Sequence, residues 1–225
     1  RRDERPVSVP TVGPAAALAG VPSGIQAQGV WAGRRQLFVR FADEAETATM
    51  FTAAALAGEL KRLSARSAYH SVSVSGRDAL GNADFLASAL ERWTPTLPVL
   101  LDGDGQRPEV VLEIGKRFSM IQTTVDFTGP DASIERALET LAAARAVDCA
   151  HALVLAPTAE TSDGQLLRLV ARAHEISDST ILIVHPPAQG EELADRRWQT
   201  VMEQAARSHA DIRLVMRIPP PAGMR

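Results

Sequence analysis

Cysteine is almost absent from this sequence of 225 residues, which contains a single one, Cys149. One thiol cannot form a disulfide within the chain, and it cannot supply a metal site that needs several cysteine ligands. A reducing, cytoplasmic compartment is therefore the expectation for this chain. The sequence also lacks any apolar run near the roughly 18 residues that a membrane-spanning helix requires, so no such helix is expected.

A surplus of positive charge is lacking as well. The sequence has 24 Lys and Arg against 27 Asp and Glu, a formal net charge of −3. Domains that bind nucleic acid usually carry a basic surplus, so nucleic-acid binding is not expected. Hydrophobic residues make up 45% and charged residues 23%, proportions typical of a globular protein with a hydrophobic core. This length favours one substantial domain.

Residues 1–23 differ in composition from the rest of the chain. They are charged at first and then rich in Pro, Ala, Gly and Val, with no sustained hydrophobic period. Such a segment cannot bury much apolar surface by itself. We therefore expect a flexible N-terminal extension over 1–23, ordered only along a partner, and a single domain over 24–225.

Short aliphatic runs then alternate with amphipathic helical stretches. Each run is bounded by Gly, Pro, Asp or Ser, as is typical of buried parallel strands. Seven strands are predicted, at Gln36–Ala42, Ser71–Ser75, Leu97–Leu101, Ser119–Asp126, Ala150–Ala156, Thr180–His185 and Ile212–Arg217. This alternation predicts an α/β fold with a parallel sheet and right-handed crossovers. A doubly wound sheet and a barrel both fit it.

Three local signals mark the starts of predicted helices between these strands. Asn82 is a candidate N-cap, because its side chain can accept a hydrogen bond from a free backbone N–H. Pro108 suits a first helical turn, which tolerates a missing N–H. Ser162 and Gln165 have the spacing of a capping box.

The segment Gly24–Ala42 reads Gly-Ile-Gln-Ala-Gln-Gly-Val-Trp-Ala-Gly-Arg-Arg-Gln-Leu-Phe-Val-Arg-Phe-Ala. It resembles the opening of the 7-carboxy-7-deazaguanine synthase family of radical-SAM enzymes. In that family a Ser-Ile-Gln-Gly-Glu-Gly stretch precedes a first strand ending in Phe-Val-Arg-Phe-Ala. The resemblance covers roughly residues 24–225 at the level of the scaffold. It implies a partial (β/α)6 TIM-like barrel with parallel strands, of the radical-SAM type.

The resemblance breaks where the family holds its cofactor. There the first strand runs into three cysteines, spaced CxxxCxxC, which bind a four-iron four-sulfur cluster and, on it, S-adenosylmethionine. The same positions here are Glu44, Ala48 and Phe51. Because cluster irons need thiolate ligands, a carboxylate, a methyl group and a phenyl ring cannot replace them. We therefore expect both the cluster and S-adenosylmethionine to be lost, with no metal site and no catalytic residue.

The acidic residues Asp43, Glu44 and Glu46 around the first of these positions are expected to form a solvated loop. An alternative is that they repel carboxylate ligands from the old cofactor site.

This sequence also differs from the family in the other loops that contact the cofactor and the substrate. Gly76 matches a glycine of a Thr-Gly-Gly-Glu-Pro-Leu loop, but Arg77 and Asp78 depart from it. The resemblance places the vestigial cofactor and substrate loops at Gln28, Gly76, Arg77, Asp78, Asp102, Asp104, Thr124, Asp126, Ile183 and Arg217.

A scaffold without a cofactor should fill the mouth of its barrel, because large voids are costly. We predict that Met50 and Phe51 pack inward. We also predict that no pocket of about 300 Å³ or more remains at the carboxyl ends of the strands. Arg77 and Arg217 are long enough to reach the vestigial acidic residues, namely Asp78, Asp102, Asp104 and Asp126.

Other reactive residue types have plainer interpretations. Cys149 is predicted to be a buried structural thiol, with a catalytic pairing to nearby His151 as the alternative. Asp102-Gly-Asp-Gly-Gln106 resembles the start of a calcium loop but lacks a Glu at its twelfth position, so a tight turn is predicted. The remaining histidines have no metal-ligand spacing: His70, His174, His185 and His209.

Three functions follow from the sequence. The first is a catalytically inactive pseudoenzyme, which serves as a structural or accessory subunit through protein partners or as a homo-oligomer. The second is a module that binds a small molecule, a nucleoside or a SAM-like compound, in the old barrel mouth. The third is an enzyme with new chemistry in that cavity. A mouth filled by side chains favours the first function, and an open polar cavity favours the second.

Overall fold

The computed structural model describes residues 13–44, 46–76, 78–187 and 196–218. In this part of the chain ten strands form one curved sheet, in the order β10-β9-β8-β7-β6-β5-β3-β1-β4, and β2 pairs with β3. The strands are β1 (Ala15–Gly20), β2 (Ser23–Ile25), β3 (Arg35–Phe41), β4 (Thr49–Thr52), β5 (Ser71–Gly76), β6 (Val99–Gly103), β7 (Met120–Val125), β8 (His151–Leu155), β9 (Ile181–Val184) and β10 (Ile212–Leu214). The α-helices are α1 (Ala53–Arg66), α2 (Ala83–Trp93), α3 (Pro108–Ile114), α4 (Asp131–Ala146), α5 (Asp163–Ile176) and α6 (Arg196–Ser208).

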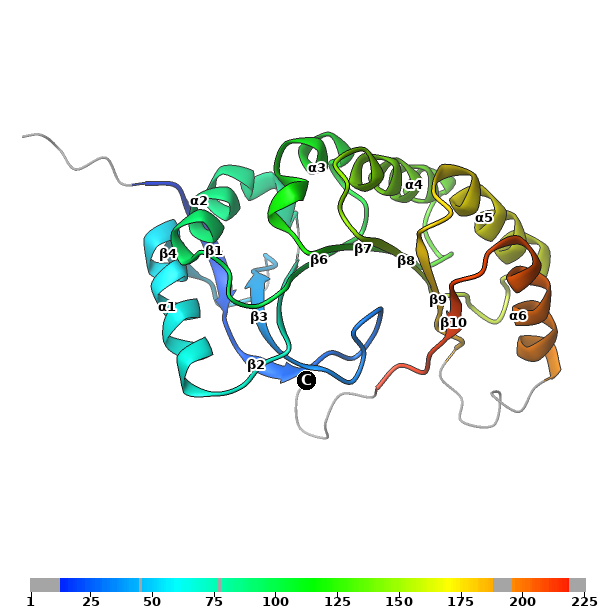
Figure 1. Cartoon of the computed structure of the whole chain (residues 1–225), viewed down its shortest axis with the longest axis horizontal. Helices are drawn as coiled ribbons and strands as arrows, with labels where there is room; N and C mark the ends of the chain where they lie inside the picture. The colour runs from blue at the N-terminus through cyan, green and yellow to red at the C-terminus, as the bar shows by residue number, and fades with distance from the viewer. Residues whose placement is uncertain (1–12, 45, 77, 188–195, 219–225) are drawn as a thin grey trace, which may run out of the picture.

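The seven strands predicted from the sequence form the parallel part of the sheet. β3, β5, β6, β7, β8, β9 and β10 pair in chain order, each parallel to the next. A doubly wound sheet would reverse its strand order at a switch point, and these strands do not. Figure 1 shows the sheet as an arc with the helices along its outer side. The architecture is therefore α/β with a mostly parallel sheet, and it is consistent with a partial barrel.

Three short antiparallel strands extend this parallel sheet, and the sequence did not predict them. β1 pairs antiparallel with both β3 and β4, and its Ala16 and Leu18 are buried. The predicted flexible extension over 1–23 is therefore wrong for β1. The reason is that Ala16 and Leu18 alternate with exposed residues, so one face of this Ala-rich strand packs on the core. Residues 1–12 lie outside the described residues, so the prediction for them stands untested.

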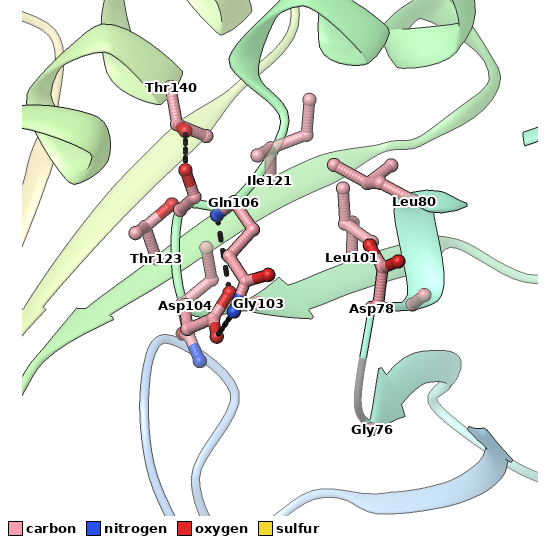
Figure 2. A pocket seen from close by; sticks show the side chains of 13 residues that line it. Gly76, Asp78, Leu80, Leu101, Gly103, Asp104, Gln106, Ile121, Thr123 and Thr140 are labelled. Atoms are coloured by element: carbon pink, nitrogen blue, oxygen red, sulfur yellow. Dashed lines mark hydrogen bonds between the residues drawn. The ribbon is translucent and has the colours of Figure 1, made fainter. Parts of the chain in front are cut away.

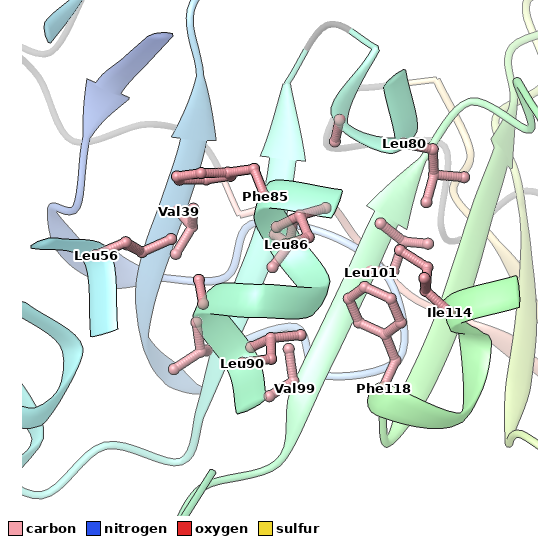
Figure 3. Packing of buried hydrophobic residues seen from close by; sticks show 14 of the residues in the cluster. Val39, Leu56, Leu80, Phe85, Leu86, Leu90, Val99, Leu101, Ile114 and Phe118 are labelled. Atoms are coloured by element: carbon pink, nitrogen blue, oxygen red, sulfur yellow. The ribbon is translucent and has the colours of Figure 1, made fainter. Parts of the chain in front are cut away.

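The outer face of the sheet carries the hydrophobic core (Figure 3). Under α1 and α2, Val39 and Leu101 of the sheet belong to the same buried cluster as Leu56, Phe85 and Leu86 of the helices. Each such side chain contributes about 1.5–3 kcal/mol when it is fully buried. A second buried cluster lies under α4, α5 and α6. These two clusters fix the helices on the outside and leave the concave face for other contacts.

The predicted helix starts fall where the sequence placed them. Pro108 is the first residue of α3, and Ser162 and Gln165 form the capping box of α5. Asn82 directly precedes α2, but its side chain makes no capping hydrogen bond there. Among the described residues, none of the helices combines the length and the apolar character that crossing a membrane requires.

Candidate functional site: the concave face of the sheet

The loop between β2 and β3, residues 26–34, lies against the concave face of the sheet; we call it the inner loop. Figure 1 shows it as a blue segment inside the arc of strands. Val30 and Trp31 in this loop pack on a buried cluster of Leu100, Met120 and Ala152 from β6, β7 and β8. The apolar side chains of the loop therefore fill the concave face near the amino ends of these strands.

Two backbone N–H groups of the inner loop are bound by side chains of the sheet. The N–H of Val30 donates to Oε1 of Gln122 at 2.8 Å, and the N–H of Gly29 donates to Nε2 of His185 at 2.9 Å. A backbone group that loses water needs such a partner, because an unpaired one costs about 1–3 kcal/mol. The loop is thus held by specific polar contacts as well as by its apolar side chains.

A carboxylate joins these contacts into one network. Asp102, at the end of β6, accepts a hydrogen bond from Nε2 of Gln122 at 2.9 Å and a second from Nε2 of Gln26 at 3.2 Å. Loss of water around the Asp102 carboxyl raises its pKa, and the hydrogen bonds from Gln122 and Gln26 act in the opposite direction. Asp102 thereby ties the start of the inner loop to β6 and β7.

His185 binds the inner loop in its neutral form. Burial lowers the pKa of His185, and the nearby charge of Arg217 lowers it further. The hydrogen bond to the Val215 carbonyl acts in the opposite direction. Nδ1 donates to the Val215 oxygen at 2.5 Å, which leaves Nε2 as the acceptor for Gly29. Both ring nitrogens of His185 are therefore used to hold backbone groups.

Gly29 has a conformation and a position that exclude other residues. Its φ is +82°, a region that residues with a Cβ rarely adopt. A Cβ built on Gly29 would lie 2.0 Å from Oε1 of Gln122. The inner loop can approach β7 this closely only with glycine at this position.

A small hollow remains at the carboxyl ends of β5, β6 and β7 (Figure 2). Gly76, Asp78, Asp104, Gln106 and Thr123 are among its lining residues, and its cavity volume is about 30 Å³. A space of this size holds about one water molecule. This volume is far below the roughly 300 Å³ of a small-molecule pocket. A larger hollow of about 420 Å³ lies between α4 and α5 and includes Phe127, just after β7, so the prediction holds for this hollow only.

The predicted positions of the lost iron–sulfur ligands do not form a site. Glu44 and Ala48 are exposed in the segment before β4. Phe51 lies within β4, half-buried, and packs against the core on the outer, helix-covered side of the sheet. Since none of these side chains offers a thiolate, the residues present do not fit the cluster that the resemblance implies.

The prediction that Met50 packs inward is wrong. Met50 pairs with Ala17 of β1 at the edge of the sheet, and 68% of its surface is exposed. Successive side chains of a strand point to opposite faces, so Met50 and Phe51 cannot both be buried against one core. The prediction is also wrong for Phe51, which is only half-buried and faces the outer core instead of the concave face.

The acidic residues that the resemblance predicted to be vestigial have different partners. Asp78 binds Arg107, with 2.7 Å between Oδ2 and Nη2. Asp104 accepts from the side chain of Gln106 at 2.7 Å, and Asp126 accepts from backbone N–H groups that follow it in the chain. Of the four, Asp78 and Asp104 line the small hollow, whereas Asp102 and Asp126 do not.

Other residues of the vestigial set have structural roles. Gly76 has a φ of +106°, and a Cβ there would lie 2.3 Å from the carbonyl oxygen of Phe41, so the close approach of β3 and β5 requires glycine. Ile183 is fully buried, and the hydroxyl of Thr124 is buried with no hydrogen-bond partner in the described part of the chain. Gln28 is half-buried in the inner loop. Arg77 lies outside the described residues.

Cys149 is buried, as the sequence predicted. Its Sγ lies 3.4 Å from the Phe118 carbonyl oxygen, and loss of water together with the charge of Asp148 raises the pKa of the thiol to about 11. His151 binds the carbonyl oxygen of Cys149 and the hydroxyl of Ser177 through its two ring nitrogens. The alternative of a catalytic Cys–His pair is therefore wrong.

Three polar residues of the interior were missed from the sequence: Gln26, Gln122 and His185. Gln122 lies inside a predicted strand, and a polar residue there is the one local signal that could have identified it. Gln26 lies among Gly, Ala and Gln residues and has no such signal. Gln26 and its partner Asp102 are 76 residues apart in the sequence, and His185 and its partner Gly29 are 156 residues apart. Only the fold brings these groups together.

Comparison of the chain with protein-family models and with curated proteins found no match in either case.

Proposed function

We propose that this chain is a catalytically inactive, radical-SAM-like scaffold that serves as a structural or accessory subunit through protein–protein contacts. The observation that carries the proposal is the inner loop. It covers the concave face of the sheet and is bound there by Gln122, His185 and Asp102. Enzymes of this architecture bind their substrates at the carboxyl ends of the strands. The inner loop reaches that end through its bonds to Asp102, near the end of β6, and to His185, after β9.

The residues that stand where the resembled family binds its cofactor support the same proposal. Glu44, Ala48 and Phe51 offer neither thiolates nor a shared cavity, and the one cysteine of the sequence, Cys149, is a buried thiol. The partial barrel then serves as a scaffold whose outer surfaces can bind other proteins. The proposed compartment is the cytoplasm, where the Cys149 thiol stays reduced.

The competing proposal is a module that binds a nucleoside or a SAM-like compound. For that function the inner loop would have to leave the sheet and break its bonds to Gln122 and His185, since the hollow beside it has only about 30 Å³. Ligand binding to the folded state raises the melting temperature. We expect no shift with S-adenosylmethionine, S-adenosylhomocysteine or nucleosides, and a reproducible stabilisation by one of them would favour the binding module.

Native mass spectrometry of the protein isolated from its own source tests the accessory role. We expect a complex of fixed stoichiometry, either with a second protein or with further copies of this chain. A monomer without a companion, under conditions that preserve known complexes in the same extract, would contradict the proposal.

A further inference from the structure

Two histidines that are far apart in the sequence meet where α5 and α6 end. His174 lies in the last turn of α5, and His209 directly follows α6. Their Nδ1 atoms are 3.2 Å apart, and the rings are nearly perpendicular, with 5.3 Å between their centroids. Figure 1 shows the two helices next to each other on the outside of the sheet. This pair takes no part in the network of the inner loop.

The hydrogen bonds of His209 fix which of its nitrogens carries a proton. Nε2 of His209 lies 2.6 Å from the carbonyl oxygen of Thr180, so this nitrogen is the donor. Nδ1 is then unprotonated, and its lone pair faces His174. A histidine that binds a metal is usually held in this way, with its second ring nitrogen donating to a carbonyl group or a carboxylate.

We propose that His174 and His209 form a surface site for a divalent transition-metal ion of the Zn²⁺, Ni²⁺ or Cu²⁺ class. Imidazole nitrogen is a preferred ligand of these ions. Two nitrogens 3.2 Å apart subtend an angle of about 100° at an ion about 2.0–2.1 Å from each, which is close to tetrahedral. Water fills the remaining coordination positions. Binding requires the proton of His174 to move from Nδ1 to Nε2, with no net release.

The electrostatics of this position favour a cation. The pair lies at the carboxyl ends of both α5 and α6, and a helix carries partial negative charge at that end. Glu175 and Asp178 are exposed carboxylates that follow His174 in the chain, and Arg207 in the last turn of α6 opposes their effect. His209 is buried and fixed, whereas His174 is exposed, so an ion can enter from solvent and the His174 ring can rotate slightly toward it.

Calorimetric titration of the metal-free protein with Cu²⁺, Ni²⁺ and Zn²⁺ tests this site. We expect one ion per chain, with Cu²⁺ bound more tightly than Ni²⁺ or Zn²⁺. His174→Ala should weaken binding by at least about tenfold, because losing even a supporting hydrogen bond of a ligand costs 10–100-fold. His174 is exposed, so this variant is expected to fold. His70→Ala removes the histidine directly before β5 by the same substitution and serves as the matched control, with unchanged affinity.

The copper complex gives a second measurement that does not depend on affinity. Its electron paramagnetic resonance spectrum should show coupling to imidazole nitrogen in the wild type, with a reduced number of nitrogens in His174→Ala. Equal affinity and equal spectra in the wild type and His174→Ala would overturn the proposal, as would the absence of binding in the wild type.

Discussion

The backbone N–H of Gly29 donates a hydrogen bond to Nε2 of His185 at 2.9 Å, across 156 residues of chain. Gly29 belongs to the loop before β3, the first parallel strand, and His185 follows β9. A second bond, from the N–H of Ile218 to the carbonyl oxygen of Ala27 at 2.9 Å, lies alongside it. The inner loop therefore joins the two ends of the parallel sheet across its concave face.

Replacing Gly29 by alanine should loosen this connection. A residue with a Cβ at positive φ costs about 1–2 kcal/mol, and the overlap with Gln122 adds about 1–3 kcal/mol. Gly33 in the same loop is the matched control, because its φ of +80° is nearly the same but a Cβ there meets nothing closer than 3.9 Å. In urea unfolding we expect Gly29→Ala to lose more stability than Gly33→Ala. Equal losses would mean that the inner loop does not pack against Gln122.

Asp102 should make the stability of the protein depend on pH. Its pKa in the folded chain is raised above the ordinary value of 3.8, so the folded state keeps a proton that the unfolded state has released. Stability therefore falls as pH rises from about 3.8 through the raised pKa, and the effect is absent below that window. Asp102→Asn cannot ionise, so its stability relative to the wild type should increase across the window.

Urea unfolding at a series of pH values measures this difference. Asp104→Asn removes a carboxylate from the same turn without touching the interior network, and it controls for the change in net charge. The account of Asp102 fails if the wild type and Asp102→Asn show parallel pH profiles.

The parallel part of the fold was predictable from the sequence, and the interior was not. Strands such as β8 consist mainly of consecutive buried aliphatic residues, and such a run can be recognised directly in the sequence. β1 and β4 are short and formed by small or neutral residues, so they resemble loop sequence until they pair with each other. The resemblance assigned Glu44, Ala48 and Phe51 to one cofactor site, but in the structure they do not share a site. No local pattern indicated that residues 26–34 lie against the sheet.

Met50 and Phe51 provide a test of the edge strand β4. Met50 is largely exposed, so Met50→Ser should change the free energy of unfolding by less than about 0.5 kcal/mol. Phe51 packs on the outer core, so Phe51→Ala should cost about 1–3 kcal/mol, less than the 3–5 kcal/mol of a fully buried phenylalanine. Denaturant unfolding of both variants checks this, and a larger loss in Met50→Ser would show that β4 has the opposite register.

Cys149 should be unreactive in the folded protein. With a thiol pKa of about 11, roughly one thousandth of the thiol is ionised at pH 8, and the side chain is buried. We expect a thiol-specific reagent to modify the native protein slowly and the urea-unfolded protein at once. Modification of the native protein at the rate of the unfolded chain would place Cys149 at the surface.

Anaerobic reconstitution with iron and sulfide tests most directly the central claim that this scaffold has no iron–sulfur chemistry. Because Glu44, Ala48 and Phe51 stand where the resembled family has its cysteines, we predict that the desalted protein stays colourless and retains no stoichiometric iron. About four iron atoms per chain, together with the broad visible absorption of an iron–sulfur cluster, would contradict the claim.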